Sequence, residues 1–270
     1  MAGIRIGILG AGGRMGQALV RAAAAAPDVQ VSGGTEVEGS PWLGKDVGEP
    51  AGLGLLGAAI VADPRTLFEA SDVVLDFTAA VAVPRHAQIA SELGKAYVVG
   101  TTGLAAAEER AVLTAAKRAP IVKSANMSVG VNLLIALTRK AAAALDLNFD
   151  AEILEMHHRH KVDAPSGTAK ALGHAVAEAR GQTHDRVAVM SREGVTGERR
   201  RGEIGYATLR GGLVVGEHTV MFTSDRERIE LTHRASSRDI FAEGAVTAAR
   251  WLHDKPPGLY GMTDVLGLTD

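Results

Sequence analysis

A short apolar run passes directly into a glycine-rich turn at Ile4-Arg5-Ile6-Gly7-Ile8-Leu9-Gly10-Ala11-Gly12-Gly13-Arg14-Met15-Gly16. The run is rich in β-branched residues and predicts a buried parallel strand. An apolar helical face follows and ends near Pro27. Val29–Ser32 predicts the next strand, and Glu36 stands just beyond it. A strand, a glycine-rich turn, a helix, a second strand and an acid in this order are typical of a dinucleotide-binding βαβ unit.

The glycine-rich turn is expected to lie against the pyrophosphate of the cofactor. Glycines let the backbone approach the phosphates, and the start of a helix favours their negative charge. The spacing departs from the usual pattern, because Met15 stands where the third glycine is expected and Gly16 follows it. Gly10, Gly13 and Gly16 form an alternative set with even spacing.

The charges near the end of the second strand indicate whether the cofactor is NAD or NADP, which differ in the 2′ substituent of the adenine ribose. Glu36 is placed to accept hydrogen bonds from the hydroxyl groups of the adenine ribose, which favours NAD. The 2′-phosphate of NADP needs a cation beside that acid, yet Val37 follows Glu36 and no Lys or Arg lies between Arg21 and Lys45. We therefore predict that NADH serves at least as well as NADPH, unless a distant arginine such as Arg85 folds over the site.

Further apolar segments predict the other strands of this parallel sheet, at Ile60–Val61, Val73–Phe77, Ala96–Val99 and Ile121–Lys123. A helix is expected at Pro84–Leu93. Ligands of such sheets bind beyond the carboxyl ends of the strands. The expected cofactor-lining positions are therefore Thr78, Gly100–Thr102 and Ser124–Met127, although Gly, Ser and Thr are also favoured in ordinary turns.

A second domain is expected to follow. A helix at residues 128–145 leads into predicted strands at Phe149–Met156, Val187–Ser191, Ile204–Leu209, Val214–Thr223 and Ile229–Ala235. We read Gly211-Gly212 and Ser224-Asp225 as hairpin turns and Arg199-Arg200-Arg201 as a solvated loop. A last helix at Ile240–Leu252 is expected to pack on the first domain.

The predicted fold class is therefore α/β. A Rossmann-type doubly wound parallel sheet is expected in a dinucleotide-binding domain of residues 1–127, completed by residues 239–270. A second α+β domain on a mixed, largely open sheet is expected in residues 128–238, for substrate binding and oligomerisation. One face of such a sheet is left uncovered, which is a common basis for an oligomer.

The segment with the most chemistry is Glu155-Met156-His157-His158-Arg159-His160-Lys161-Val162-Asp163-Ala164-Pro165-Ser166-Gly167-Thr168-Ala169. Three of the nine histidines and a lysine fall within five of its residues. Ser166 is a suitable N-cap, so Gly167 and Thr168 are expected in the first turn of a helix. Backbone N–H groups at a helix start lack intrahelical partners and lie at the positive end of the dipole. Together with the nearby cations, this helix start suits a small substrate that carries carboxylates.

Two plainer interpretations of this tract stay open, a solvated loop and a metal site. The chain has no cysteine, and Glu155 and Asp163 do not stand at the spacings of zinc motifs, so we predict no metal. The position between a strand end and a capped helix favours a ligand site over a plain loop.

The composition indicates a globular protein without a nucleic-acid or membrane partner. Of its 270 residues, 46% are hydrophobic and 22% are charged, and the net charge is −2. The lack of cysteine fits a reducing compartment. No segment resembles a signal peptide or a membrane span, so we expect a cytoplasmic protein.

These segments together resemble the dihydrodipicolinate reductases, also called 4-hydroxy-tetrahydrodipicolinate reductases, of lysine and diaminopimelate biosynthesis. The resemblance runs nearly end to end and is most specific at Glu155–Ala169. The other shared motifs are Gly10–Gly16, Gly100–Gly103, Ser191–Gly194, Gly216–Thr219 and Ala235–Arg238.

The resemblance implies a role for each matching residue. His157 would donate a proton with Lys161 as its catalytic partner, and His158, Gly167 and Thr168 would bind the carboxylates of the substrate. The implied cofactor contacts are Gly10, Ala11, Gly12, Gly13, Arg14, Met15, Glu36, Gly100, Thr101, Thr102, Ser124, Ala125, Asn126 and Met127. The family also implies a homotetramer formed through the second-domain sheet. Many members carry Arg at the position of Val37 and Phe at the position of Met127, and the first difference agrees with the charge argument for NADH.

The implied activity is that of an oxidoreductase, the NAD(P)H-dependent reduction of 4-hydroxy-tetrahydrodipicolinate to tetrahydrodipicolinate. Loss of water conjugates the C=N bond of the ring with a C=C bond, hydride adds to a ring carbon, and a proton is added to the neighbouring atom. Histidine, with an ordinary pKa of about 6.5, suits proton donation near neutrality. Two alternatives stay open, an amino acid dehydrogenase of similar two-domain plan acting on an acyclic imine, and a dinucleotide-binding sensor without catalysis.

Overall fold

The computed structural model describes residues 3–268, which form two compact units. The first unit contains the segment up to Val129 and the segment from Asp239 onward, and the second contains Gly130–Arg238. Each unit has its own sheet and its own apolar core. No helix within the described range is both long enough and apolar enough to cross a lipid bilayer.

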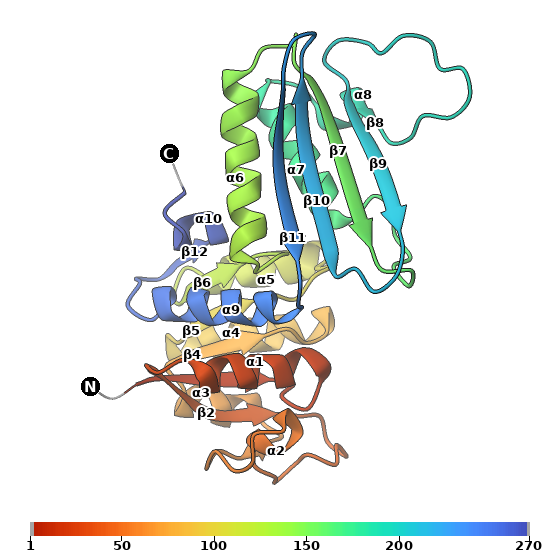
Figure 1. Ribbon diagram of the computed structural model, residues 1–270. Helices are drawn as coiled ribbons and strands as arrows, with labels where there is room; N and C mark the ends of the chain where they lie inside the picture. Colours follow the sequence, from red (N-terminus) through yellow and green to blue (C-terminus); the bar gives the residue numbers. More distant parts are fainter. Residues whose placement is uncertain (1–2, 269–270) are drawn as a thin grey trace. The chain divides into compact units, whose positions relative to one another are not determined.

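The first unit is built on a parallel sheet of seven strands in the order β12-β6-β5-β4-β1-β2-β3 (Figure 1). The strands are β1 (Ile4–Leu9), β2 (Val29–Thr35), β3 (Ile60–Val61), β4 (Val73–Asp76), β5 (Ala96–Val99), β6 (Pro120–Lys123) and β12 (Gly258–Tyr260). The order turns back between β1 and β4, so the loops after these two strands flank a crevice at the carboxyl edge of the sheet. This arrangement confirms the predicted doubly wound parallel sheet.

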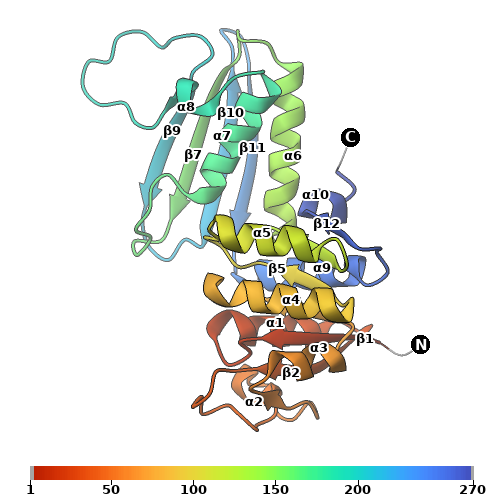
Figure 2. The same ribbon diagram turned by 180° about the vertical axis from the view of Figure 1, so that it is seen from behind.

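Helices cover both faces of this sheet, as the opposite views in Figures 1 and 2 show. One face packs on α1 (Arg14–Ala25), α9 (Asp239–Leu252) and α10 (Met262–Val265), and the other on α3 (Pro64–Ala70), α4 (Val83–Leu93) and α5 (Ala106–Ala115). Side chains alternate along each strand, so Ile6 and Ile8 enter the first core whereas Leu9 enters the second. The short α2 (Gly48–Ala51) and η1 (Ala80–Ala82) lie in connecting segments.

The late segment of the chain completes the first unit, as predicted for the last helix. The small side chains of Ala242, Ala245 and Ala249 are fully buried in α9 and let it pack closely on its neighbours. Gly244 of the same helix lies against the backbone carbonyl of Met127, where a Cβ would collide. The edge strand β12 and helix α10 were not foreseen from the sequence.

The second unit is built on a mixed sheet of five strands in the order β11-β10-β7-β9-β8. The strands are β7 (Asp150–His157), β8 (Ala188–Val189), β9 (Ile204–Arg210), β10 (Gly216–Thr223) and β11 (Arg228–Ala235). Helices α6 (Val129–Ala144) and α7 (Gly167–Ala179) lie on one face, and the short α8 (His184–Val187) precedes β8 (Figures 1 and 2). Ile153, Val220 and Phe222 are fully buried under these helices, and the described residues place no helix on the opposite face. The predicted α+β arrangement on an open mixed sheet is confirmed.

One local prediction in this unit is wrong, and a second is right only in part. Gly211-Gly212 joins β9 to β10, but these strands are not neighbours, because β7 lies between them and pairs with both. The turn at Ser224 does close a hairpin, between β10 and β11. Arg200 and Arg201 are exposed, as predicted. Arg199 is not a solvated loop residue, since only 19% of its side chain is exposed and its guanidinium binds the Asp150 and Glu152 carboxylates. It fixes the long β8–β9 connection to the start of β7.

Candidate active site

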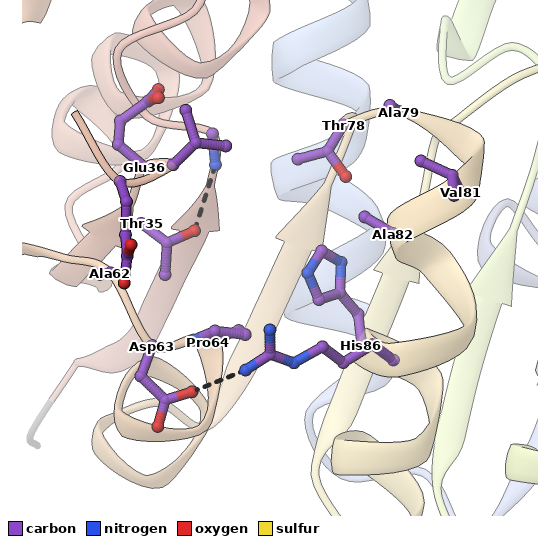
Figure 3. A pocket seen from close by; sticks show the side chains of 14 residues that line it. Thr35, Glu36, Ala62, Asp63, Pro64, Thr78, Ala79, Val81, Ala82 and His86 are labelled. Carbon is purple, nitrogen blue, oxygen red and sulfur yellow. Dashed lines mark hydrogen bonds and ion pairs between the residues drawn. The ribbon is translucent and has the colours of Figure 1, made fainter. Parts of the chain in front are cut away.

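The first unit contains a cavity of about 680 Å³ at the carboxyl edge of its parallel sheet (Figure 3). It is lined by residues that follow β1, β2, β3 and β4 and by the start of α4, namely Gly10, Thr35, Glu36, Val37, Glu38, Ala62, Asp63, Pro64, Thr78, Ala79, Val81, Ala82, Arg85 and His86. The predicted positions Gly10, Glu36 and Thr78 all lie on this cavity. It therefore occupies the place where a doubly wound sheet binds its ligand.

The glycine-rich turn has the shape that a dinucleotide requires. Gly10 has a φ of 69°, a conformation that favours glycine. A Cβ at Gly16 would collide with the carbonyl oxygen of Gly10, so this glycine lets α1 begin directly against the turn. No side chain caps the start of α1, whose N-cap is Gly13. These features fit a pyrophosphate held by backbone N–H groups at a helix start.

Glu36 closes the other side of the turn. Its Oε1 accepts a hydrogen bond of 2.9 Å from the Gly12 N–H, and Gly10 N–H lies 3.4 Å from Thr35 Oγ1. The Glu36 carboxylate is therefore positioned by the turn, and Glu36 also lines the cavity.

A buried carboxylate that sequence analysis did not single out supports this cavity. Asp76 at the end of β4 is fully buried and accepts hydrogen bonds from the Thr78 N–H (2.8 Å) and hydroxyl (2.6 Å). It also binds His86 Nδ1 at 2.7 Å and the Tyr97 hydroxyl. Burial acts to raise the pKa of Asp76, but the hydrogen bonds and the His86 charge lower it by a larger amount, so the net shift is downward. The visible sequence signal was an acid at the end of an otherwise apolar strand.

The other predicted cofactor positions lie outside the lining of this cavity. Ala11–Met15 belong to the glycine-rich turn and the start of α1, whereas Gly100–Thr102 and Ser124–Met127 follow β5 and β6. Thr101 is buried, and its hydroxyl donates to the Thr78 carbonyl at 3.2 Å, which links the loops after β5 and β4. The Ser124 hydroxyl donates to the Asn126 carbonyl at 2.7 Å. Met127 is 1% exposed and packs in the core of the unit, so its side chain is part of the fold rather than of an open surface.

A separate group of polar side chains lies in the second unit, at the end of β7. Alternation along this strand places Glu155 and His157 on the helix-covered face, in line with the buried Ala151 and Ile153. The sheet register adds a partner from each neighbouring strand, because Glu155 is opposite His218 of β10 and His157 is opposite Arg210 of β9. Strand geometry thus gathers a carboxylate, two imidazoles and a guanidinium.

Glu155 is the centre of this group. Its side chain is fully buried and receives His157 Nδ1 at 2.6 Å, the Ser166 N–H at 3.0 Å, and two Arg210 nitrogens at 2.8 and 2.9 Å. Burial acts to raise the pKa of Glu155, but the hydrogen bonds from Arg210, His157 and Ser166 outweigh it and lower the pKa overall. Glu155 is therefore an ionised acceptor at neutral pH.

His218 has the opposite character. Burial, followed by the nearby His157 charge, lowers the pKa of His218 to about 4, so its ring is neutral at pH 7. Its Nε2 lies 3.0 Å from Ser166 Oγ, and its ring meets that of His157 edge to face at a centroid distance of 5.1 Å. His218 is thus a packing and hydrogen-bonding partner that does not compete for charge with its neighbour.

The loop after β7 carries the other predicted residues. Lys161 Nζ lies 2.8 Å from Asp163 Oδ1, and Arg210 donates to the Asp163 carbonyl at 2.7 Å, which connects this loop to Glu155. His158 Nε2 lies 3.0 Å from an Arg238 nitrogen, and burial with the nearby Arg238 charge lowers the pKa of His158. His157, His158 and Lys161 therefore each contact a different charged residue, namely Glu155, Arg238 and Asp163.

Helix α7 begins where it was predicted. Ser166 is its N-cap, with Oγ accepting the Ala169 N–H at 3.1 Å, and Gly167 and Thr168 follow in the first turn. The Ser166 N–H in turn donates to Glu155, so the helix start and His157 share one buried carboxylate. The structure therefore brings His157 together with the predicted carboxylate-binding turn.

Sequence analysis missed three members of this group, Glu155, Arg210 and His218. Glu155 was considered only as a metal ligand, and His218 only as part of a motif. The sequence signal for Glu155 and His218 was the alternation along β7 and β10, in which each of these polar residues stands on the side of the strand that is otherwise apolar. Arg210 gave no local signal, because it lies 55 residues from Glu155.

Comparison with known proteins identifies the family. The family model described as dihydrodipicolinate reductase, N-terminus, matches residues 4–127, and the C-terminus model matches residues 130–266. A 4-hydroxy-tetrahydrodipicolinate reductase of Parvibaculum lavamentivorans is 51% identical and covers 99% of both chains. One of Chelativorans sp. is 53% identical over 97% of this chain and 95% of its own.

Solved structures share the fold. A dihydrodipicolinate reductase from Paenisporosarcina sp. TG-14, solved with dipicolinate bound, aligns with a TM-score of 0.78 at 24% identity and covers 97% of this chain and 98% of that chain. An amine dehydrogenase from Mycobacterium smegmatis aligns with a TM-score of 0.57 at 15% identity and covers 95% of this chain and 94% of that chain. With two family models spanning nearly the whole sequence, the chain belongs to the dihydrodipicolinate reductase family.

Proposed function

We propose that this protein reduces 4-hydroxy-tetrahydrodipicolinate to tetrahydrodipicolinate, a step of lysine and diaminopimelate biosynthesis, with NADH or NADPH as reductant. The observation that carries the proposal is the shared carboxylate of Glu155, which holds the His157 ring and the α7 start in one group. A proton donor beside an anion-binding turn suits the reduction of a ring that bears carboxylates. The names of the relatives supply the substrate.

In the proposed reaction each unit has a separate task. The first unit binds the cofactor, which supplies hydride when it is bound. In the second unit, the Gly167–Thr168 turn and His158 bind the substrate carboxylates, and Lys161 stabilises negative charge on the substrate. His157 then delivers a proton from Nε2, since Nδ1 is held by Glu155.

The cavity of the first unit favours NADH at least as well as NADPH. Glu36, Glu38 and Asp63 bring three carboxylates to its lining, and the one arginine there, Arg85, is paired with Asp63 at 3.3 Å. A 2′-phosphate would meet more like charge than opposite charge in this place. Michaelis constants for both cofactors test this, and a preference for NADPH of tenfold or more would contradict it.

The activity is tested by oxidation of NADH and NADPH with freshly prepared substrate, with pyridine-2,6-dicarboxylate as a planar competitor. Turnover with this substrate supports the proposal. Binding of NADH without turnover would indicate the dinucleotide-binding sensor, and turnover only with 2-oxo acids and ammonia would indicate an acyclic imine dehydrogenase.

His157→Gln tests the proton donor. Loss of a general acid is expected to lower kcat by about 10²–10⁴-fold with a smaller change in KM. His160→Gln is the matched control, because His160 is an exposed histidine of the same loop with no assigned role. A His157→Gln enzyme that keeps kcat within about threefold of the parent would remove the assignment.

We further propose a cytoplasmic homotetramer assembled through the uncovered face of the five-stranded sheet. The family resemblance supplies the oligomeric state, and the free sheet face in the described residues supports it.

A further inference from the structure

The carboxylate of Glu155 has more hydrogen-bond partners than a structural acid at a strand end needs. One oxygen receives His157 Nδ1 and the other receives the Ser166 N–H, while Arg210 donates to both. All of these groups belong to the second unit. The oxygen that faces the imidazole is therefore fixed in place by bonds that do not involve the imidazole.

We infer that Glu155 is a positioning residue for the reaction, which selects the tautomer of His157 and stabilises its doubly protonated ring. The inference rests on the proposed function, in which His157 is the proton donor. Arg210 supports Glu155 from β9 as its bidentate counter-ion.

The tautomer follows from the inventory of donors. An ionised carboxylate can only accept, so His157 Nδ1 must carry a hydrogen, and the transferable proton must be on Nε2. Nε2 is the atom of the His157 ring nearest to Gly216, where an added Cβ would lie only 3.0 Å from it. The lack of a side chain at Gly216 therefore leaves room beside the nitrogen from which the proton departs. After transfer the ring is neutral and keeps its bond to Glu155, so the donor changes charge without moving.

The charged and titratable groups around this pair come from every neighbouring element. Arg210 faces it from β9 and His218 from β10, while Lys161 lies in the loop after β7. His218 is opposite His233 of β11, and its Nε2 bonds to Ser166 rather than to Glu155 or His157. Among these described groups, Glu155 is the acid that contacts the His157 ring. Its negative charge therefore stabilises the positive charge of the doubly protonated ring.

Glu155→Gln tests this inference because it keeps the shape and still offers an oxygen to the Ser166 N–H. Its amide nitrogen would donate to Nδ1 and so move the ring hydrogen to Nε2 in the neutral form. We expect kcat to fall by about 10²-fold or more, as in wrong-tautomer variants of other histidine enzymes, with KM within about threefold. ¹⁵N NMR of the imidazole rings is expected to show the change of tautomer, and the alkaline limb of the kcat profile is expected to move to lower pH.

Three further measurements keep the outcomes separate. Glu152→Gln is the matched control, since Glu152 is an ion-paired glutamate of the same strand on the opposite face. If His157→Gln is inactive while Glu155→Gln keeps kcat, pH profile and tautomer, this inference is wrong and the proposed function stands. If His157→Gln is fully active, the assignment of His157 as proton donor fails first, and this inference fails with it. Should Glu155→Gln not fold, Arg210→Lys replaces it, with a smaller loss of kcat and the same direction of the pH shift expected, and an unchanged profile counting against the inference.

Discussion

At the scale of single residues, both units place a buried carboxylate at the end of a strand and bond it to an imidazole. Asp76 binds His86, which lines the cavity of the first unit, and Glu155 binds His157. Each carboxylate has a lowered pKa because its hydrogen bonds outweigh the effect of burial. A buried carboxylate without hydrogen-bond partners costs free energy. The need for these partners therefore holds the loops that carry them in fixed positions.

The buried imidazole of His218 predicts how stability depends on pH. Its pKa is about 4 when folded and about 6.5 when unfolded, so the unfolded chain binds the extra proton between these values. This contribution is complete above pH 6.5 and is lost as pH falls toward 4. Between pH 7 and 4.5 it amounts to about 2 kcal/mol of unfolding free energy.

Urea denaturation at both pH values measures this effect. His218→Gln should lose markedly less stability on acidification than the parent protein, while His160→Gln should behave like the parent. Equal pH dependence in all three proteins would show that His218 is protonated in the folded state. Glu155 adds a separate loss only below about pH 4.3, where the unfolded carboxylate takes up its proton.

Val37 predicts a change of cofactor preference. It lines the cavity beside Glu36 and is 75% exposed, so Val37→Arg can offer a guanidinium to a 2′-phosphate. We expect KM for NADPH to fall by about tenfold, equivalent to about 1.4 kcal/mol, while KM for NADH changes little. Val37→Gln, which adds length without charge, is the control, and an equal gain in that variant would argue against a charge effect.

At the scale of secondary structure, the start of α1 depends on one glycine. A side chain at Gly16 would collide with the backbone of Gly10 and Ala11, neither of which can move as a side-chain tip can. Gly16→Ala is therefore expected to destabilise the protein and to raise KM for both cofactors by about tenfold or more. Ala24→Gly, on the exposed face of the same helix, should cost about 1 kcal/mol of stability and leave KM unchanged. A stable Gly16→Ala enzyme with normal KM would show that the turn can relax.

Elements with strong local signals were predictable. The strands β1, β4 and β5 are runs of apolar, mostly β-branched residues, and the Ser166 cap marks the start of α7. The start of α3 also had a local signal that went unused, an Asp63 cap followed by Pro64. By contrast β12 is only three residues long and becomes a strand by pairing with β6, far away in the sequence.

The residue types of the site could be predicted from the sequence, but their hydrogen-bond partners could not. The tract at 155–169 indicated imidazole, ammonium and a helix start from local sequence alone. Which acid binds which imidazole depended on the register of β7 with β9 and β10. The error at Gly211-Gly212 has the same origin, since nothing in the turn reveals that β7 separates the strands it joins.

At the scale of the whole molecule, the uncovered face of the five-stranded sheet predicts the effect of a charge on assembly. Met221 points away from the buried side of β10, which carries Val220 and Phe222. If the homotetramer forms through this face, Met221→Lys should dissociate it, because a buried unpaired charge is costly.

Light scattering after size-exclusion chromatography measures the assembly, against the 28.0 kDa of one chain. Leu113→Lys, on the exposed side of α5, is the control and should leave the assembly intact. A Met221→Lys protein with the mass of the parent would place the interface elsewhere.

The first unit is assembled from both early and late segments of the chain, and this sets an order of events during synthesis. Residues up to Val129 are translated before the second unit, yet α9 and β12, which cover part of one face and one edge of the same sheet, are translated after it. The second unit, Gly130–Arg238, is continuous and is translated completely before them. A nascent chain that ends before Asp239 would expose the part of the apolar sheet face that α9 covers, which is a target for chaperones, whereas the second unit would already have all five strands of its sheet.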